Sequence, residues 1–307
     1  MSGPQFQSQS QSKPQFTLDV RTVSDGEAGP YALTTGPDGA LWFTLVHAGR
    51  IGRLVPGGEV TSHRLDPASG PTVITPGPDG ALWFTEYRAH RIGRITTDGA
   101  VSGFALPTPE CGPFGIAAGP DGALWFTETA ADRIGRITVD GDVTEFPLPV
   151  AGAFPSAIAA GGDGGMWFAL NQANALGRIG MDGAVELHPL PTPDAAPVGV
   201  AAGPDGAVWF VEIAAGQVGR RTPDGKITEF PLPDRAARPH AVTVADDGTA
   251  WFTEWGGNRV GSVTPNGAVA TYDLPVPRSE PHGIAVGPDG ALWAALETGD
   301  LVRVAPA

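Results

Sequence analysis

Gly77-Pro-Asp-Gly-Ala-Leu-Trp-Phe-Thr-Glu86 decides the fold of this 307-residue chain, because variants of this stretch return seven times along it. The tryptophans of the seven copies follow one another in one step of 41 residues and five of 42, at Trp42, Trp83, Trp125, Trp167, Trp209, Trp251 and Trp293. Prolines upstream keep the same steps, at Pro30, Pro71, Pro113, Pro155, Pro197, Pro239 and Pro281. A fixed period of about 40 residues is typical of solenoids and propellers.

One repeat unit, residues 113–149, predicts four short strands. They cover Phe114–Ala118, Ala123–Glu128, Arg133–Thr138 and Val143–Leu148. Asp-Gly turns separate these runs, and no helical period is present, which is the pattern of a propeller blade. Seven such units predict an all-β, seven-bladed β-propeller with four-stranded blades.

The two ends of the chain predict how the ring closes. The last unit stops after its third strand, Asp300–Ala305, and the segment Phe16–Val23 supplies a strand that has no unit of its own. We expect the N-terminal strand to complete the seventh blade, because this pairs an edge that would otherwise be open. Residues 15–307 then form a single propeller domain, and residues 1–14, rich in Gln and Ser, are predicted to be a flexible polar tail.

Charge and composition narrow the setting of the protein. The formal net charge of -14 argues against nucleic acid or an anionic membrane as the main partner, because both select basic surfaces. The single cysteine, Cys111, cannot form an internal disulfide, which suits a reducing compartment. No apolar run approaches the roughly 18 residues of a membrane span. We therefore expect a cytoplasmic protein, and nothing in the sequence indicates an oligomer, so a monomer is expected.

The informative residues of a repeat protein are those that break the repeat. We call the proline that recurs upstream of each tryptophan the marker proline. From the first unit to the last, the residue after it is Tyr31, Thr72, Phe114, Ser156, Val198, His240 and His282. The residue before it runs Gly29, Gly70, Gly112, Phe154, Ala196, Arg238 and Glu280. The residue four after the tryptophan runs Val46, Tyr87, Thr129, Asn171, Ile213, Trp255 and Glu297. The last two units therefore differ chemically from the others at three aligned positions.

These positions are predicted to meet at one opening of the central channel, where propeller loops commonly carry function. A two-residue hairpin turn would place His282 directly opposite Glu297, whereas a Pro-Asp-Gly turn with a bulge would shift the register by one and make the two residues diagonal neighbours. Two carboxylates suit a hard divalent cation such as Mg²⁺. A metal that polarises a carbonyl makes the adjacent Cα proton more acidic, and a nearby neutral imidazole can then remove that proton. Alone, this spacing is also compatible with surface side chains that have no function.

Other repeated or isolated polar residues have structural interpretations. The repeat tryptophans are expected to pack between blades. The glutamates three after the tryptophan are expected to pair with repeat arginines such as Arg94, Arg136 and Arg220; they are Glu86, Glu128, Glu212 and Glu254. Four histidines outside the aligned positions are interpreted as ordinary surface or loop residues: His47, His63, His90 and His188. Cys111 is expected to be inert.

The chain resembles the virginiamycin B lyase family, the streptogramin B lyases, over roughly residues 16–305. The resemblance rests on the Trp-Phe-Thr-Glu units, on Arg91-Ile-Gly-Arg and Asn258-Arg-Val-Gly after them, and on two motifs in the last units. These motifs are Arg238-Pro-His-Ala and Glu280-Pro-His-Gly, and Glu297 at the end of the following strand accompanies them.

The resemblance implies a fold and a reaction. Members of this family are seven-bladed propellers that linearise type B streptogramins, which are cyclic depsipeptide antibiotics, by Mg²⁺-dependent elimination at the ester bond, and so confer resistance. Carried over to this chain, Glu280 and Glu297 would hold Mg²⁺, His282 would be the general base, and His240 and Tyr31 would contact substrate. Trp255 is expected to offer an aromatic face.

Two alternative functions stay open at this point. One is a metal-dependent lactone or ester hydrolase on the same fold, in which the metal activates water. The other is a non-catalytic binding propeller, which would not need two His and two Glu concentrated in two adjacent units. The oxygen ligands do not separate Mg²⁺ from Mn²⁺.

Overall fold

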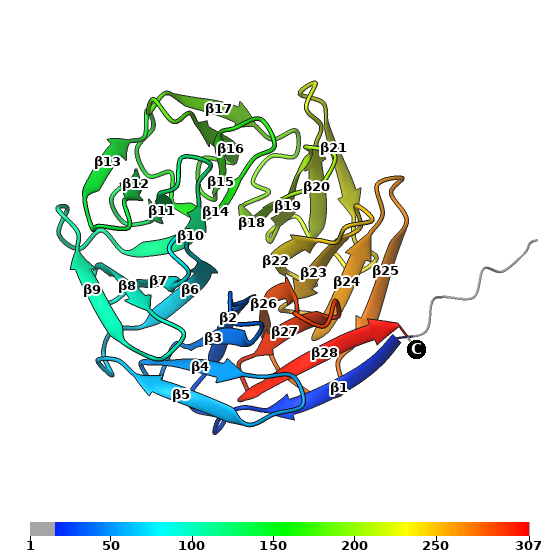
Figure 1. The fold of residues 1–307 in the computed structure, drawn as a ribbon. Helices are drawn as coiled ribbons and strands as arrows, with labels where there is room; N and C mark the ends of the chain where they lie inside the picture. The colour runs from blue at the N-terminus through cyan, green and yellow to red at the C-terminus, as the bar shows by residue number, and fades with distance from the viewer. Residues whose placement is uncertain (1–15, 307) are drawn as a thin grey trace, which may run out of the picture.

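The computed structural model describes residues 16–306, which form 28 β-strands and no helix. The strands are arranged as seven four-stranded antiparallel sheets around a central axis (Figure 1). The predicted seven-bladed propeller is therefore confirmed. The predicted tail, residues 1–14, lies outside the described residues. Since these residues contain no helix, none of them forms a helix that could cross a membrane.

The strands follow one another from the inner to the outer edge of each blade. Blade 1 contains β2 (Pro30–Thr35), β3 (Leu41–Leu45), β4 (Arg50–Leu54) and β5 (Val60–Arg64). Blade 2 contains β6 (Pro71–Pro76), β7 (Leu82–Glu86), β8 (Arg91–Ile95) and β9 (Val101–Ala105). Blade 3 contains β10 (Pro113–Ala118), β11 (Leu124–Glu128), β12 (Arg133–Ile137) and β13 (Val143–Pro147). Blade 4 contains β14 (Pro155–Ala160), β15 (Met166–Leu170), β16 (Ala175–Ile179) and β17 (Val185–Pro189). Blade 5 contains β18 (Pro197–Ala202), β19 (Val208–Glu212), β20 (Gln217–Arg221) and β21 (Ile227–Pro231). Blade 6 contains β22 (Pro239–Val244), β23 (Ala250–Glu254), β24 (Arg259–Val263) and β25 (Val269–Asp273). Blade 7 contains β26 (Pro281–Val286), β27 (Leu292–Leu296) and β28 (Asp300–Pro306), and its outermost strand is β1 (Phe16–Thr22).

The N-terminal strand closes the ring. β1 pairs with β28 in antiparallel register from Phe16 opposite Pro306 to Thr22 opposite Asp300. Figure 1 shows the two strands side by side at the outer edge of the seventh blade. The predicted closure is therefore confirmed, and it pairs the otherwise free edge of β28. Blade 7 is in contact with blade 1 on one side and blade 6 on the other, since β26 lies against both β2 and β22.

The inner hairpin of every blade has a β-bulge directly after the marker proline. In blade 7, Pro281 pairs with Leu296 and Ile284 pairs with Ala294, so that two residues, His282 and Gly283, lie opposite one. The other six inner hairpins shift register at the same place. A bulge re-aims a side chain and twists the strand locally. The position at which the sequence breaks its repeat is thus the position at which the strand is bulged.

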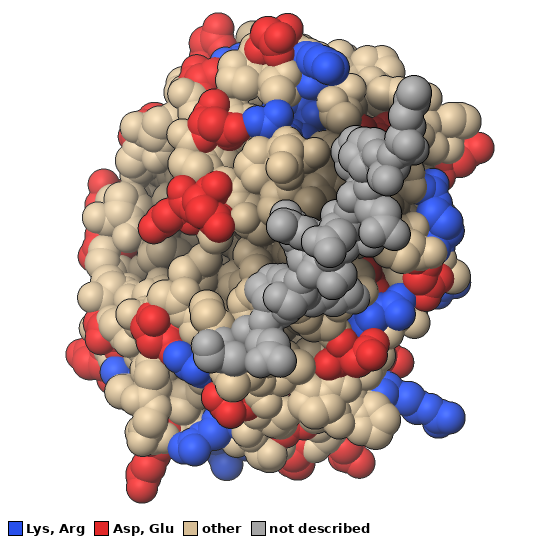
Figure 2. Space-filling model, turned by 90° about the vertical axis from the view of Figure 1, so that its right-hand side faces the viewer, with Lys and Arg blue, Asp and Glu red and all other residues tan. Residues whose placement is uncertain are grey.

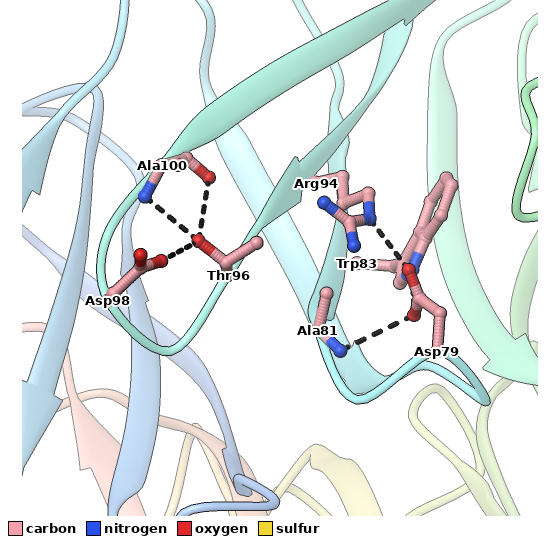
Figure 3. Close-up of polar contacts among 7 residues, drawn as sticks. All are labelled: Asp79, Ala81, Trp83, Arg94, Thr96, Asp98 and Ala100. Atoms are coloured by element: carbon pink, nitrogen blue, oxygen red, sulfur yellow. Dashed lines mark hydrogen bonds and ion pairs between the residues drawn. The ribbon is translucent and has the colours of Figure 1, made fainter.

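The opposite end of the inner hairpin is held by an Asp–Trp–Arg triad in blades 1, 2, 3, 4 and 7. In blade 2, Trp83 Nε1 donates to Asp79 Oδ1 at 3.0 Å, and Arg94 Nε donates to Asp79 Oδ2 at 2.7 Å. Ala81 N donates to the same carboxylate at 3.3 Å, which closes the turn (Figure 3). The next turn of the blade is closed by Thr96, whose side chain bonds Asp98 and Ala100. Trp83 is fully buried, as expected for packing between blades.

The arginine partners predicted for the buried glutamates are wrong. Arg94, Arg136 and Arg220 pair with the turn aspartates of their own blades. The buried carboxylates have other neighbours, because the first residue of the third strand, not the fourth, reaches them. Arg91 Nε donates to Glu86 at 2.8 Å, and Arg259 Nε donates to Glu254 at 2.5 Å. Gln217 donates to Glu212, whereas the oxygens of Glu128 have no hydrogen-bond partner among the described residues.

Acidic and basic side chains are interspersed on the face of the molecule shown in Figure 2. On the face shown in Figure 2, the blue Lys and Arg side chains occur in separate groups among red Asp and Glu side chains. The part of this face that the grey atoms leave visible has no continuous basic patch.

Candidate active site

Three rings from three consecutive blades meet around His282. The Tyr31 and His282 ring centroids lie 4.5 Å apart at an interplanar angle of 31°, and the His240 and His282 centroids lie 4.8 Å apart at 79°. The Tyr31 hydroxyl lies 3.5 Å from His240 Nε2. These residues occupy the bulge position of β2, β22 and β26, and blade 7 lies between blades 6 and 1. Ring closure therefore brings together residues that are more than 200 positions apart.

Two carboxylates adjoin this group of rings. His282 Nε2 lies 2.8 Å from Glu297 Oε2. Glu280, His282 and Glu297 each offer a ligand atom, and these atoms all lie within 4.8 Å of one another. The register of the inner hairpin makes Glu297 a diagonal neighbour of His282, because Pro281 and not His282 pairs with Leu296. Of the two predicted geometries, the directly opposite one is wrong and the diagonal one is confirmed, although the bulge lies between Pro281 and Ile284, whereas the prediction put it in the Pro-Asp-Gly turn.

Glu280 adopts a backbone conformation that is unusual for its residue type. Its φ angle is 47°, in the left-handed region, and it precedes a proline, which favours extended backbone in the residue before it. The residues at this position in the other blades also have positive φ, and three of them are glycine: Gly29, Gly70 and Gly112. A non-glycine residue in this region costs about 1–2 kcal/mol. Such strain commonly gathers at functional sites.

Glu297 lies on a loop that is one residue shorter than its counterparts. Leu296 pairs with Asp300 across the loop of blade 7, whereas Glu254 pairs with Arg259 in blade 6. The backbone responds, because Glu297 N donates to Ser279 O at 2.9 Å, while the aligned Trp255 N donates to the carbonyl of the residue just before the marker proline. The aligned comparison of the sequence missed this deletion. The spacing between the repeat tryptophan and the third strand would have revealed it.

His47 belongs to the site, so its interpretation as an ordinary loop histidine is wrong. Its Nε2 lies 2.7 Å from Glu297 Oε1, across the boundary between blades 1 and 7. The signal was available, since His47 is the only histidine five residues after a repeat tryptophan. The other three histidines have contacts inside the repeat. His63 stacks on Trp42, His188 lies against Trp167, and His90 Nδ1 accepts from Gly112 N.

The electrostatic environment assigns different protonation states to these groups. The hydrogen bond from His282, followed by that from His47, lowers the pKa of Glu297 to about 2, so this carboxylate is ionised at neutral pH. Burial and the neighbouring His282 lower the pKa of His240 to about 3, which keeps its imidazole neutral. Burial and then the charge of Glu297 raise the pKa of the Tyr31 phenol, which stays protonated. The site thus combines a carboxylate that can bind a metal ion, Glu297, with two neutral hydrogen-bonding groups, His240 and Tyr31.

Comparison with known proteins identifies the family. Residues 16–304 match the sequence profile of the Virginiamycin B lyase family. The chain belongs to the virginiamycin B lyase family. It has a TM-score of 0.92 and 40% sequence identity to a streptogramin B lyase structure, over 95% of this chain and 98% of that one. It is equally similar, at 39% identity and a TM-score of 0.92, to a catalytically inactive histidine-to-alanine variant of the Staphylococcus aureus virginiamycin B lyase with quinupristin, over 95% and 100% of the two chains.

Curated members of the virginiamycin B lyase family match over short segments. The chain is 64% identical over 55 residues to the enzyme of Saccharopolyspora erythraea, which covers 17% of this chain and 18% of the relative. It is 67% identical over 43 residues to the enzyme of Streptomyces coelicolor, 14% of each chain. These matched segments span less than a fifth of the length of either relative.

In this member of the virginiamycin B lyase family, the donor set fits a hard divalent cation. Two carboxylates converge with an imidazole on one point, and Mg²⁺ in proteins is usually bound by one or two carboxylates while waters and substrate oxygens fill the other positions. Glu297 is 27% exposed in its side chain, so the point is open to such ligands from solution. The buried Nδ1 of His282 has no partner among the described residues.

Trp255 lies beside this site and outside the repeat of structural tryptophans. Its ring centroid is 6.5 Å from that of His282, and the Arg238 guanidinium lies over the ring at 5.4 Å from the centroid. The structure therefore places Trp255 where the sequence predicted an aromatic face. With it, all six predicted site residues lie on the same end of blades 1, 6 and 7.

We call the opening of the central channel at which these residues lie the mouth of the propeller. An apolar pocket of about 260 Å³ extends from His240 across the mouth toward blades 2 to 5. Its lining residues occupy the same repeat positions as the site residues, and they are Tyr87, Phe114, Thr129, Phe154, Ser156, Asn171, Val198, Ile213 and His240. Phe154 is 41% exposed, which is unusual for so large an apolar side chain. One end of the ring thus offers polar chemistry on blades 6, 7 and 1 and an apolar surface on the remaining blades.

Proposed function

We propose that this protein linearises type B streptogramin antibiotics by Mg²⁺-dependent elimination at the ester bond of the ring. The observation that carries the proposal is the convergence of Glu280, His282 and Glu297 at one point on the mouth of a propeller of this family. The relative solved with quinupristin supports it, because that protein is catalytically inactive after a single histidine-to-alanine change.

The reaction requires removal of a proton from carbon and departure of an oxygen from the neighbouring carbon. His282 takes the proton from Cα of the threonine residue, the electron pair forms the Cα=Cβ double bond, and the Cβ–O bond breaks. The ester group leaves as a carboxylate, so the ring opens without consuming water. Mg²⁺, when bound by Glu280 and Glu297, supplies a Lewis acid for the threonine carbonyl, which makes the Cα proton more acidic.

The surroundings of His282 suit a general base. Glu297 is ionised and can only accept hydrogen bonds, so in the described arrangement the Nε2–H of His282 donates to it. Nδ1 is buried, so we infer that Nε2 takes the substrate proton once Glu297 has turned toward the cation. A carboxylate beside an imidazole stabilises the imidazolium that forms when the proton arrives. General-base catalysis of this kind contributes about 10²–10⁴-fold to a rate.

The remaining residues suit a large, mixed-polarity substrate. His240 stays neutral, so it can exchange hydrogen bonds with amide groups of a peptide ring without adding charge. Trp255 and Tyr31 present aromatic rings beside the base, and the apolar pocket provides room for apolar side chains of a macrocycle. Linearisation destroys the cyclic form of the antibiotic, and we propose that resistance follows from it.

Mass spectrometry of a type B streptogramin incubated with the protein tests the proposal directly. Elimination leaves the mass unchanged and creates a double bond, whereas hydrolysis adds one water. We expect a mass-neutral product with Mg²⁺, and none with a chelator or with His282→Ala. A hydrated product would instead identify a hydrolase, and intact substrate under all conditions would contradict catalysis on this substrate class.

A further inference from the structure

His47 is held against Glu297 by the backbone of its own loop. His47 N donates to Ala28 O at 3.1 Å, and Val46 N donates to Gly29 O at 3.0 Å. These bonds anchor the loop between β3 and β4 on the chain that enters β2. The imidazole, 44% exposed, then reaches from blade 1 to the carboxylate of blade 7.

The space that His47 occupies exists because residue 29 has no side chain. A Cβ on Gly29 would lie 2.4 Å from His47 Cδ2 and 3.0 Å from its Nε2, so no other residue fits beside this ring orientation. Backbone conformation alone does not require glycine here, since the aligned Phe154, Ala196 and Glu280 adopt positive φ with side chains. Gly29 therefore leaves room for an imidazole that points at Glu297.

The two oxygens of Glu297 have separate partners. His47 Nε2 lies 2.7 Å from Oε1, and His282 Nε2 lies 2.8 Å from Oε2. Because an ionised carboxylate only accepts hydrogen bonds, both imidazoles donate to it. His47 thus has no lone pair on the nitrogen that faces Glu297, and nitrogen is in any case a poor ligand for Mg²⁺. Its contact orients the carboxylate and adds no ligand atom.

We propose that His47 is a positioning residue that holds Oε1 of Glu297 and so presets Oε2 toward Glu280 and His282 for cation binding. The inference rests on the metal site of the proposed function. Glu297 projects from a three-residue loop and is partly exposed, so without His47 only the contact of Oε2 with His282 would hold its carboxylate before the cation binds. Hydrogen-bond partners of metal ligands are typically worth 10–100-fold in metal affinity.

Direct measurement of Mn²⁺ binding by electron paramagnetic resonance tests this on the full chain without any substrate. His47→Ala is expected to weaken Mn²⁺ binding 10–100-fold. His47→Gln should restore most of the affinity, because its amide N–H can donate from the place of Nε2. Gly29→Ala should reproduce the loss by displacing the ring.

Arg88→Ala is the matched control. Arg88 occupies the His47 position of blade 2 and lies over Gly70 as His47 lies over Gly29, whereas the side-chain hydrogen bonds of Glu297 among the described residues go to His47 and His282. Its replacement should leave Mn²⁺ affinity unchanged. Circular dichroism of each variant checks that the propeller is intact.

Each contrary result has its own meaning. Wild-type affinity in His47→Ala, or a Gln variant as weak as the Ala variant, would overturn the positioning role. A wild-type protein that binds no Mn²⁺ would remove the metal site together with this inference. A protein that binds Mn²⁺ in the expected order but leaves streptogramin intact would refute only the proposed function.

Discussion

Blades 2 and 7 are nearly identical at one end of their inner hairpins and chemically different at the other. Asp79 accepts from Trp83 at 3.0 Å in blade 2, and the equivalent bond in blade 7 is 3.1 Å long. Both hairpins have the same bulge. At the mouth, however, blade 2 has Gly70, Thr72 and Tyr87, where blade 7 has Glu280, His282 and Glu297.

The difference shows that the fold and the chemistry depend on separate residues of one repeat. The triad and the buried tryptophan maintain the hairpin, while the bulge and the loop after the second strand only present side chains to the mouth. Blade 7 also replaces the buried Glu86–Arg91 pair by Leu296 and Asp300 and shortens the loop. These changes leave the sheet intact and redirect a carboxylate.

Replacement of His282 is expected to have the largest effect. His282→Ala should lower kcat for streptogramin linearisation by about 10²–10⁴-fold, because the general base is lost. The melting temperature should change little, since the ring leaves Nδ1 unpaired.

Thr72→Ala, at the same bulge position of blade 2, is the control for this variant. It removes the hydroxyl contact with Thr85 and should leave kcat unchanged. Equal losses of activity in the two variants would mean that the bulge position matters for folding only.

Removal of a tryptophan should separate structure from substrate contact. Trp83→Ala is expected to cost about 3–5 kcal/mol in the free energy of unfolding, because a fully buried ring is lost. Trp255→Ala should cost less than about 1 kcal/mol in stability but raise KM roughly tenfold, through loss of an aromatic contact of about 1 kcal/mol. Urea unfolding and steady-state kinetics measure the two effects. A stability loss of similar size in both variants would contradict the division.

A buried carboxyl group of blade 3 should affect stability with pH and leave catalysis alone. Burial, followed by the neighbouring Glu145, raises the pKa of Glu128 to about 8 from an ordinary value of 4.5. Because the folded value is the higher one, the stabilisation is complete below the unfolded pKa and is lost as pH rises through the folded pKa.

The variant Glu128→Gln keeps the size of the side chain without its charge. Relative to wild type, it should gain unfolding free energy between pH 5 and pH 9, because the wild-type carboxyl group loses its stabilisation as pH rises and the uncharged amide does not. Denaturant titrations at both pH values measure this gain. Parallel pH profiles for the two proteins would show that Glu128 does not titrate in this range.

The smallest effect is expected from the strained residue of the site. Glu280→Gly should raise the unfolding free energy by about 1 kcal/mol, because glycine adopts positive φ freely. The same variant should lose metal affinity. Gly70→Ala, at the same position and a φ of 59°, should shift stability by a similar amount in the opposite direction. A Glu280→Gly protein that is less stable than wild type would show that the glutamate stabilises the fold and does not destabilise it through backbone strain.

Much of the molecule could be predicted from the repeat. The period defined the blades, the incomplete last unit predicted closure by β1, and the residues that break the repeat lie together at one mouth. The errors came from interactions across strands or blades. Glu86, Glu212 and Glu254 bond the first residue of the third strand, and His47 contacts Glu297 across the boundary between blades 1 and 7.

A periodic sequence determines local structure, because hairpin turns, buried tryptophans and strand pairing within a blade involve residues fewer than about 40 positions apart. It also exposes the positions that depart from the pattern. The pairing of His47 with Glu297, 250 residues apart, was decided only by the closed ring. Closure makes the first and last blades neighbours, and a three-residue loop then aims the carboxylate across their boundary. The spacing from Trp42 marks His47 as a residue that departs from the repeat, but its contact with Glu297 depends on the distance through space between the first and last blades.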